Sequence, residues 1–186
     1  MNEIFVGTIQ KENNQNEYKI NIDSKQGILY SDGYIHDLSW LIPGESFVYT
    51  SGDGFLNIAS ITNSFEINKT NLLFRDKLCS DTIRQISIDD FSSRIAFGGY
   101  DKKLNIFNFD DGRSSISSNT DGKISYNVSG NIGSINWHPT EPIHLSYTTD
   151  EGMWVLADLR DKNIESCLIP RRIHLDLREH IFGSVS

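Results

Sequence analysis

The sequence predicts an all-β fold made of three copies of one four-stranded sheet, because its apolar residues and its turn acids recur at a fixed spacing. The turn acids Asp53, Asp101 and Asp150 are 48 and 49 residues apart. The apolar anchors keep the same spacing and are Ile35, Leu38 and Trp40, then Ile83, Ile86 and Ile88, then Ile132, Ile135 and Trp137. No amphipathic helical stretch of useful length interrupts them. Strand-only repeats of about 40 to 50 residues are typical of β-propeller blades.

The first full blade is predicted at residues 33–80. Residues 35–40 form its innermost strand and residues 47–50 its second strand, with the turn Pro43-Gly44 between them. Glycine and aspartate tolerate the positive φ angles of tight hairpins, so Ser51-Gly-Asp-Gly54 predicts a hairpin before a third strand at 55–61. A fourth, edge strand is expected within residues 64–73.

Two further blades are predicted at residues 81–129 and 130–170. The strands of the second blade are expected at 82–88, 94–97, 104–109 and 123–128. Those of the third are expected at 132–137, 143–148, 153–159 and 164–169. One extra residue in the turn Asp150-Glu-Gly152 keeps the apolar alternation of the third blade in register.

Both ends of the chain are predicted to be partial blades. Residues 1–32 contain short alternating apolar runs, such as Tyr18, Ile20 and Ile22, which are typical of the outer strands of a blade. Residues 171–186 are expected to start a further blade. A closed propeller of this period needs about seven blades. We therefore expect an incomplete ring, in which the chain is a fragment, or a missing segment or a second chain completes the propeller.

Composition limits the classes of partner. Seventeen basic and 25 acidic residues give a formal net charge of −8, which disfavours a broad electrostatic contact with nucleic acid or an anionic membrane. No apolar run approaches the roughly 20 residues of a membrane-spanning helix. The chain has only two cysteines and no cationic, apolar leader, so we expect an intracellular protein, in the cytoplasm, the nucleus or both.

The repeats resemble the WD-repeat family of β-propellers over residues 33–161. The inner strands match its V-x-x-L-x-W pattern, Pro43 and Pro139 match its proline turn, and Ala157-Asp-Leu-Arg160 takes the place of its W-D-x-R ending. The resemblance is to a degenerate repeat, because the Gly-His pair is missing and the third-strand tryptophan is replaced by Ala59, Phe107 and Ala157. The kelch family has a similar period, and Gly98-Gly99 is similar to its double glycine.

The resemblance implies two kinds of partner besides a general scaffold role. Some family members dock on the adaptor of a cullin ubiquitin ligase through the W-D-x-R ending, which here corresponds to Asp158 and Arg160, with Arg171 and Arg172 nearby. Arginine forks suit partners rich in carboxylates. Residues 179–186 look like a segment of the histone-binding members, which implies a chromatin-associated protein.

The sequence predicts no metal, cofactor or catalytic site. No Cys-x-x-Cys or His-x-x-x-His pair, no Gly-x-Ser-x-Gly elbow and no phosphate-binding loop before a helix is present. Since Asp53, Asp101 and Asp150 recur at the repeat period, each is expected to cap its own turn through local hydrogen bonds. The three tryptophans occupy alternating apolar positions, so we expect them to be buried between blades.

These observations predict a non-enzymatic scaffold that binds other proteins in a multiprotein complex. The repeat framework carries no catalytic constellation, and a fold alone does not choose its partner. The alternatives are the chromatin-associated and ubiquitin-ligase roles above. A propeller enzyme with a site at the central channel, using carboxylates or histidines from absent blades, is the remaining alternative; loss of an activity on mutating His36 or Asp37 would favour it.

Overall fold

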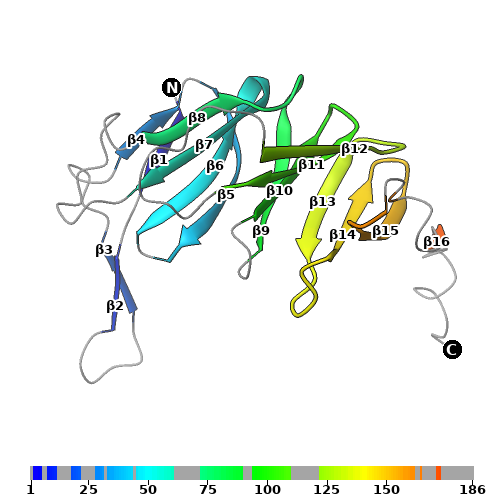
Figure 1. Ribbon diagram of the computed structural model, residues 1–186. Coiled ribbons are helices and arrows are strands. Elements are labelled where there is room, and N and C mark those ends of the chain that lie inside the picture. The colour runs from blue at the N-terminus through cyan, green and yellow to red at the C-terminus, as the bar shows by residue number, and fades with distance from the viewer. Residues whose placement is uncertain are drawn as a thin grey trace, which may run out of the picture.

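A computed structural model of the chain is almost entirely β-structure, as the sequence predicts (Figure 1). The structure describes residues 2–5, 8–11, 18–21, 28–31, 33–43, 45–60, 72–89, 94–109, 122–161, 164 and 171–172. Three four-stranded antiparallel sheets stand side by side in chain order. The described residues form an open row of sheets and no closed ring, which confirms the predicted incomplete propeller architecture.

Each sheet is a meander of four consecutive strands. The first contains β5 (Ile35–Ile42), β6 (Ser46–Ser51), β7 (Phe55–Ser60) and β8 (Leu72–Lys77). The second contains β9 (Ile83–Asp89), β10 (Arg94–Gly99), β11 (Lys103–Asn108) and β12 (Lys123–Asn127). The third contains β13 (Ile132–Trp137), β14 (His144–Thr149), β15 (Met153–Asp158) and β16 (Arg171–Arg172). A single 3₁₀ turn, Gly52–Gly54, links β6 to β7.

The register of the sheets shows that the repeats are structurally equivalent. The second apolar anchor of every inner strand faces an aromatic residue of the next strand, in the pairs Leu38 with Tyr49, Ile86 with Phe97, and Ile135 with Tyr147. Each inner strand also has a register shift next to its first anchor. The period read from the sequence is therefore a period of strand pairing.

The N-terminal residues form two separate two-stranded sheets. β1 (Asn2–Phe5) pairs with β4 (Ile28–Ser31), and β2 (Thr8–Lys11) pairs with β3 (Tyr18–Asn21). The side chains of these strands lie outside the described part of the structure. The predicted blade boundaries, including the partial blade at 1–32, stay a prediction.

The outer strands of the first and third sheets do not coincide with the predicted bounds. The edge strand expected within 64–73 is β8, Leu72–Lys77, in which only Phe74 is buried. Charged side chains at 75–77 protect this sheet edge but hide its apolar alternation from sequence reading. The outer strand expected at 164–169 lies almost wholly outside the described residues. Arg171 and Arg172, which the sequence assigns to a further blade, pair with β15.

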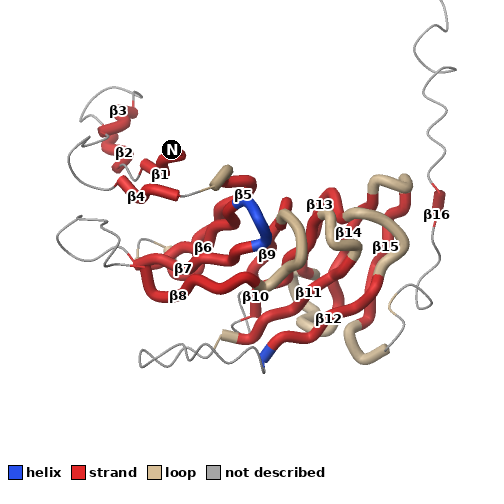
Figure 2. The backbone as a smooth tube through the Cα atoms, turned by 90° about the horizontal axis from the view of Figure 1, so that it is seen from above, coloured by secondary structure: helices blue, strands red, loops and turns tan. Residues whose placement is uncertain are grey.

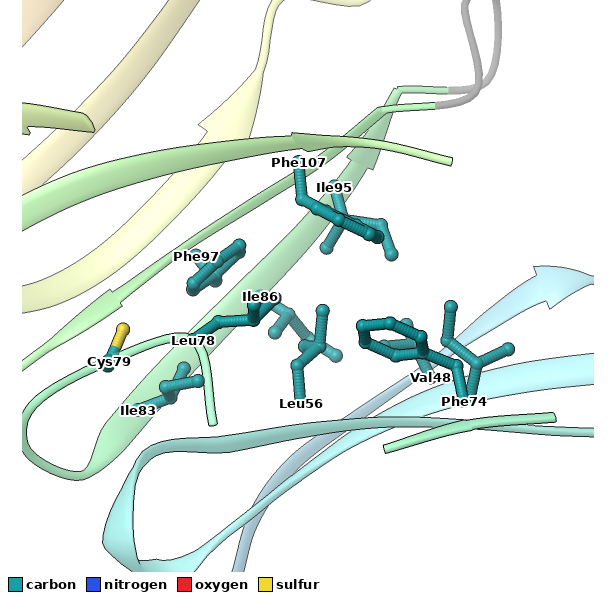
Figure 3. Packing of buried hydrophobic residues seen from close by; sticks show 11 residues of the cluster. Val48, Leu56, Phe74, Leu78, Cys79, Ile83, Ile86, Ile95, Phe97 and Phe107 are labelled. Atoms are coloured by element: carbon teal, nitrogen blue, oxygen red, sulfur yellow. The ribbon is translucent and has the colours of Figure 1, made fainter. Parts of the chain in front are cut away.

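Apolar packing joins each sheet to the next. We call the side of a sheet that faces the preceding sheet its front face, and the opposite side its back face. In the cluster of Figure 3, Val48, Leu56 and Phe74 on the back of the first sheet meet the front of the second. The rings of Phe74 and Phe107 stack there with centroids 5.3 Å apart. A second cluster joins the back of the second sheet to the front of the third, through Leu104, Ile106, Ile132, Ile135, Leu145 and Tyr147.

Hydrogen bonds between inner strands reinforce this packing. The strands β5, β9 and β13 are neighbours along one side of the row (Figure 2). The amide of Ile86 donates to the carboxylate of Asp37 at 2.8 Å. One repeat later, the indole of Trp137 donates to the carbonyl of Ser87 at 3.0 Å. Side chains and backbone of adjacent blades are thus tied at the edge where the strands converge.

Two of the three tryptophans are not buried, contrary to expectation. Trp137, between the second and third sheets, is half-buried, but Trp40 is 44% and Trp154 41% exposed. Trp40 lies on the front of the first sheet and Trp154 on the back of the third. Both faces are ends of the row, where no further four-stranded sheet stands among the described residues. On the front of the first sheet, however, Phe47 and Tyr49 are buried in a cluster with Ala59, so the exposure is confined to β5. Apolar alternation places a side chain on a face but does not say whether that face is covered.

Two leucines of the first sheet give a matched test of this arrangement. Leu56 is fully buried between two sheets, whereas Leu38 on β5 is 41% exposed. We expect Leu56→Ala to lower the free energy of unfolding by about 2 to 5 kcal/mol, because it leaves a cavity in the interface. Leu38→Ala is expected to cost about 1 kcal/mol or less. Urea denaturation of both variants measures the difference; equal losses would contradict the assigned packing.

The turn after β6 depends on Gly54. Its φ of +84° is a left-handed conformation, and its carbonyl accepts the amides of Leu78 and Cys79 at 3.0 and 3.1 Å. A Cβ built at this position lies 2.3 Å from the Cys79 carbonyl oxygen. Gly152 has a similar φ of +76° but open space around it.

Alanine substitutions at these two glycines distinguish the cost of backbone strain from the cost of a steric clash with neighbouring backbone. Gly152→Ala should cost about 1 to 2 kcal/mol of unfolding free energy, since only the left-handed conformation opposes it. Gly54→Ala should cost more, because the Cys79 segment must also move. Thermal unfolding of the two variants checks the order, and a Gly152 variant as unstable as the Gly54 variant would refute the crowding argument.

Candidate partner-binding site

The sequence-predicted pair Asp158 and Arg160 forms a compact ion pair at the end of β15. The Arg160 guanidinium donates from Nε to both carboxylate oxygens of Asp158, at 3.0 and 3.1 Å, and its terminal nitrogen lies 2.5 Å from Oδ2. The backbone amide of Arg160 donates to Oδ1 at 2.9 Å. Asp158 therefore caps the turn that presents Arg160, whose side chain is 70% exposed.

Two further residues extend this pair into a polar chain that the sequence did not reveal. The imidazole of His144 lies between carboxylates, with Nε2 3.5 Å from Asp158 and Nδ1 2.5 Å from Glu141. His144 and Asp158 face each other across β14 and β15. The neighbouring His138 accepts the amide of Glu141 through Nδ1 at 3.1 Å and so closes the turn before β14. The chain runs along the back face of the third sheet.

The pKa of Asp158 is shifted in the direction that its ion pair with Arg160 requires. Hydrogen bonds from the side chain and then the backbone of Arg160 hold the pKa of Asp158 well below its ordinary range. A lowered folded pKa means that the charged pair stabilises the fold above the ordinary carboxyl value of about 4. That contribution is lost as the pH falls through the lowered value. The ion pair is therefore fully formed at neutral pH.

The backbone of Arg171 and Arg172 lies at the other end of β15 from this pair. Arg171 is opposite Trp154, and Arg172 is opposite Met153, at the start of β15. Asp158 is at the end of the same strand. Four residues of strand rise correspond to about 13 Å. The predicted four-residue group is thus two places on one sheet, and the side chains of Arg171 and Arg172 lie outside the described part of the structure.

The turn acids occupy equivalent turns but make different contacts. Asp53 adopts a positive φ of +70°. Asp101 accepts the amide of Lys103 at 3.2 Å, as a local cap would. Asp150 instead accepts the amide and the side-chain nitrogen of Asn131, both at 2.8 Å, and the Asn131 hydrogen bonds lower its pKa. Asp150 also stands one position earlier in its turn than Asp53 and Asp101, because its amide donates to Asn131 as the amides of Gly52 and Tyr100 donate to Tyr34 and Thr82. The extra residue of the third repeat therefore lies before β14 and not in the turn Asp150-Glu-Gly152, contrary to the prediction from the sequence.

A different ion pair, missed by sequence reading, lies between the second and third sheets. Asp89 is buried and lies 2.5 Å from a guanidinium nitrogen of Arg94. Arg94 also donates to the carbonyl of Pro142, and its guanidinium carbon lies 4.5 Å from the Trp137 ring centroid. The sign of this pair in the sequence is that Asp89 stands five residues before Arg94. Its role is to bridge sheets.

The residues considered for catalysis and metal binding take part in contacts that hold the fold together or lie exposed on a strand. The Asp37 carboxylate accepts the amides of Leu38 and Ile86, and neighbouring His36 is exposed on β5. Burial, and then Asp101, raise the pKa of the Cys79 thiol, which disfavours a reactive thiolate. Among the described residues no group of three or more histidines, cysteines or acids could hold a metal ion. Residues 179–186, which carry the histone-type resemblance, lie outside the described residues.

The Asp158 titration tests the ion pair directly. We expect Arg160→Gln to raise the pKa of Asp158 toward the ordinary value of about 4, since it removes the largest stabilising contact of the carboxylate. A side-chain carboxyl NMR titration measures this value. Arg84→Gln, which removes an arginine from β9, is the matched control and should leave it unchanged. An equal Asp158 pKa with and without Arg160 would contradict the assignment.

Comparison with known proteins bears on the fold alone. No protein-family model matches the sequence, and no curated protein matches it significantly. Among solved structures, the crystal structure of the Cps50 (Swd1) β-propeller domain of Myceliophteria thermophila is similar, with a TM-score of 0.56 and 12% sequence identity. The match covers 71% of this chain but only 38% of that chain. Among the described residues, no helix is long and apolar enough to cross a membrane. The three sheets are thus folded like part of a β-propeller.

Proposed function

We propose that the chain is a non-enzymatic scaffold of the WD-repeat type, which binds other proteins within a multiprotein complex. The observation that carries the proposal is the Asp158–Arg160 pair. Three contacts with Asp158 hold a 70%-exposed guanidinium at the end of a strand, and the backbone amide of Arg160 adds a fourth hydrogen bond to the same carboxylate. A guanidinium held in one orientation loses little conformational freedom when a partner carboxylate binds it.

The surroundings favour a protein partner with acidic side chains. The chain as a whole is acidic, with a formal net charge of −8, so a nucleic acid would be repelled by most of its surface. Arg160 presents an exposed guanidinium at this surface, with its charge balanced by Asp158. Propeller-type sheets provide the rigid support that a docking site requires, and the likeness to a propeller domain supports such a framework.

A narrower role is a second candidate. The W-D-x-R resemblance implies docking on the adaptor of a cullin ubiquitin ligase, and the exposed Arg160 beside Asp158 is the arrangement that such docking would use. We propose this role below the general one, because Ala157 stands where the family has tryptophan and is fully buried. Binding of purified adaptor to the chain distinguishes the two.

Affinity purification with the full chain as bait tests the scaffold function. We expect a co-purifying protein that rebinds as a purified component, with Arg160→Ala weakening the complex by about 30-fold, which corresponds to a hot-spot loss of about 2 kcal/mol. Calorimetry measures both affinities. Arg84→Ala is the matched charge-removal control and should bind like the unsubstituted chain. The absence of any stable partner, together with turnover of a substrate by the pure protein, would overturn the proposal.

A further inference from the structure

The turn that carries Arg160 is tied to the second sheet as well as to its own sheet. The carbonyl of Leu159, the residue before Arg160, accepts a hydrogen bond from the hydroxyl of Tyr126 at 3.0 Å. Tyr126 lies on β12, the outer strand of the second sheet, where it stands opposite Leu104 and packs against the apolar cluster between the second and third sheets. The hydrogen bond therefore crosses the boundary between the two sheets.

Tyr126 and Asp158 together hold both sides of a single peptide unit. The Leu159–Arg160 peptide accepts the Tyr126 hydroxyl through its carbonyl oxygen and donates its amide to Asp158 Oδ1 at 2.9 Å. Since a peptide unit is planar, holding its oxygen and its nitrogen also fixes its rotation. The side chain of Arg160 leaves the backbone directly after this unit. Tyr126 therefore helps to set the direction in which Arg160 is presented.

The second sheet also holds the segment that supports this turn from the other strand. Arg94, paired with the buried carboxylate of Asp89, donates to the carbonyl of Pro142. The next residue, Ile143, accepts the amide of Leu159 through its carbonyl at 2.9 Å. The chain before β14 and the chain after β15 are thus both fastened to the second sheet.

The hydroxyl of Tyr126 keeps its proton at neutral pH. Burial raises its pKa above the ordinary value of about 10, and the positive charge of Arg94 has a smaller effect in the opposite direction. A carbonyl oxygen can only accept a hydrogen bond, so the contact with Leu159 requires this proton. The donor is therefore available over the whole physiological range of pH.

A tyrosine at this place is not a feature of the repeat. The positions equivalent to Tyr126 in the first and third sheets, opposite Leu56 and Trp154, carry Asp76 and Arg171. The hydroxyl therefore serves the neighbouring turn rather than the general packing of one sheet on the next.

We propose that Tyr126 is a positioning residue for the Arg160 docking site, and that this site is complete only when the second sheet is packed on the third. The inference rests on the function proposed for Arg160 and adds to it a residue from another sheet. Tyr126 acts through the Leu159–Arg160 peptide. A partner bound to Arg160 accordingly stabilises the boundary between the two sheets, because coupling between two equilibria is reciprocal.

Amide hydrogen exchange in the Tyr126→Phe variant tests the positioning role without a partner. The substitution removes only the hydroxyl and keeps the ring in the apolar cluster. The Arg160 amide should exchange about five- to tenfold faster, the effect of losing one hydrogen bond, because the peptide can then rotate away from Asp158. The Leu159 amide, which is bonded to Ile143 within the third sheet, should keep its rate. A general loosening of the sheet would accelerate both amides.

Tyr100→Phe is the matched control. It removes a hydroxyl from an exposed tyrosine in the turn between β10 and β11 of the same sheet, and should change neither rate. An unchanged Arg160 rate in Tyr126→Phe, or equal acceleration of the Arg160 and Leu159 amides, would overturn the positioning role.

Calorimetry with the protein that the full chain recovers as bait measures the effect on docking. Tyr126→Phe should weaken binding about fivefold in the unsubstituted chain and leave it unchanged in an Arg160→Ala background, because Tyr126 acts through Arg160. An equal loss in both backgrounds would mean that Tyr126 touches the partner itself, and would overturn the inference. The absence of any partner would overturn the scaffold function, whereas the exchange rates decide the role of Tyr126 independently.

Discussion

Packing of one sheet's back face on the next sheet's front face determines the arrangement of this protein. Each strand leaves apolar side chains on both sides of its sheet, so a single sheet cannot bury them all. The stacked rings of Phe74 and Phe107 show how the contact is made between the first two sheets. A fully buried leucine or phenylalanine contributes about 1.5 to 3 kcal/mol. The hydrogen bonds of Asp37 and Arg94 help to fix the position of each sheet relative to the next, because each joins residues of neighbouring sheets.

The sequence predicts the inner strands and tight turns well, because both follow local rules. Alternation defines a half-buried strand, and glycine with aspartate defines a hairpin. The outer strands are harder to predict. Their exposed edges carry charges, as at 75–77, or consist of only two residues, as in β16. Exposure of Trp40 and Trp154 could not be predicted either, since it depends on which sheet stands opposite rather than on the residue's own strand.

In the candidate site, too, local contacts could be predicted from the sequence and contacts between strands could not. Asp158 and Arg160 are two residues apart, so their pairing is a local property that the motif resemblance indicates. His144 reaches Asp158 from a different strand, and only the register of β14 on β15 brings them together. Contacts between strands depend on pairing that periodicity alone does not specify. For this reason Arg171, which is close in sequence to the pair, belongs to the other end of the strand.

Each sheet is formed by strands that follow one another along the chain, and this affects how the protein opens. Hairpins of consecutive strands close short loops, so every sheet is a unit whose internal contacts are local in sequence. The second sheet packs against a four-stranded sheet on both sides, whereas among the described residues the first and the third do so on one side only. Amide protons of β10 and β11 should accordingly be the slowest to exchange with deuterated water, with protection declining toward both ends of the row. Local opening would begin at the outermost sheets and leave the middle one intact longest.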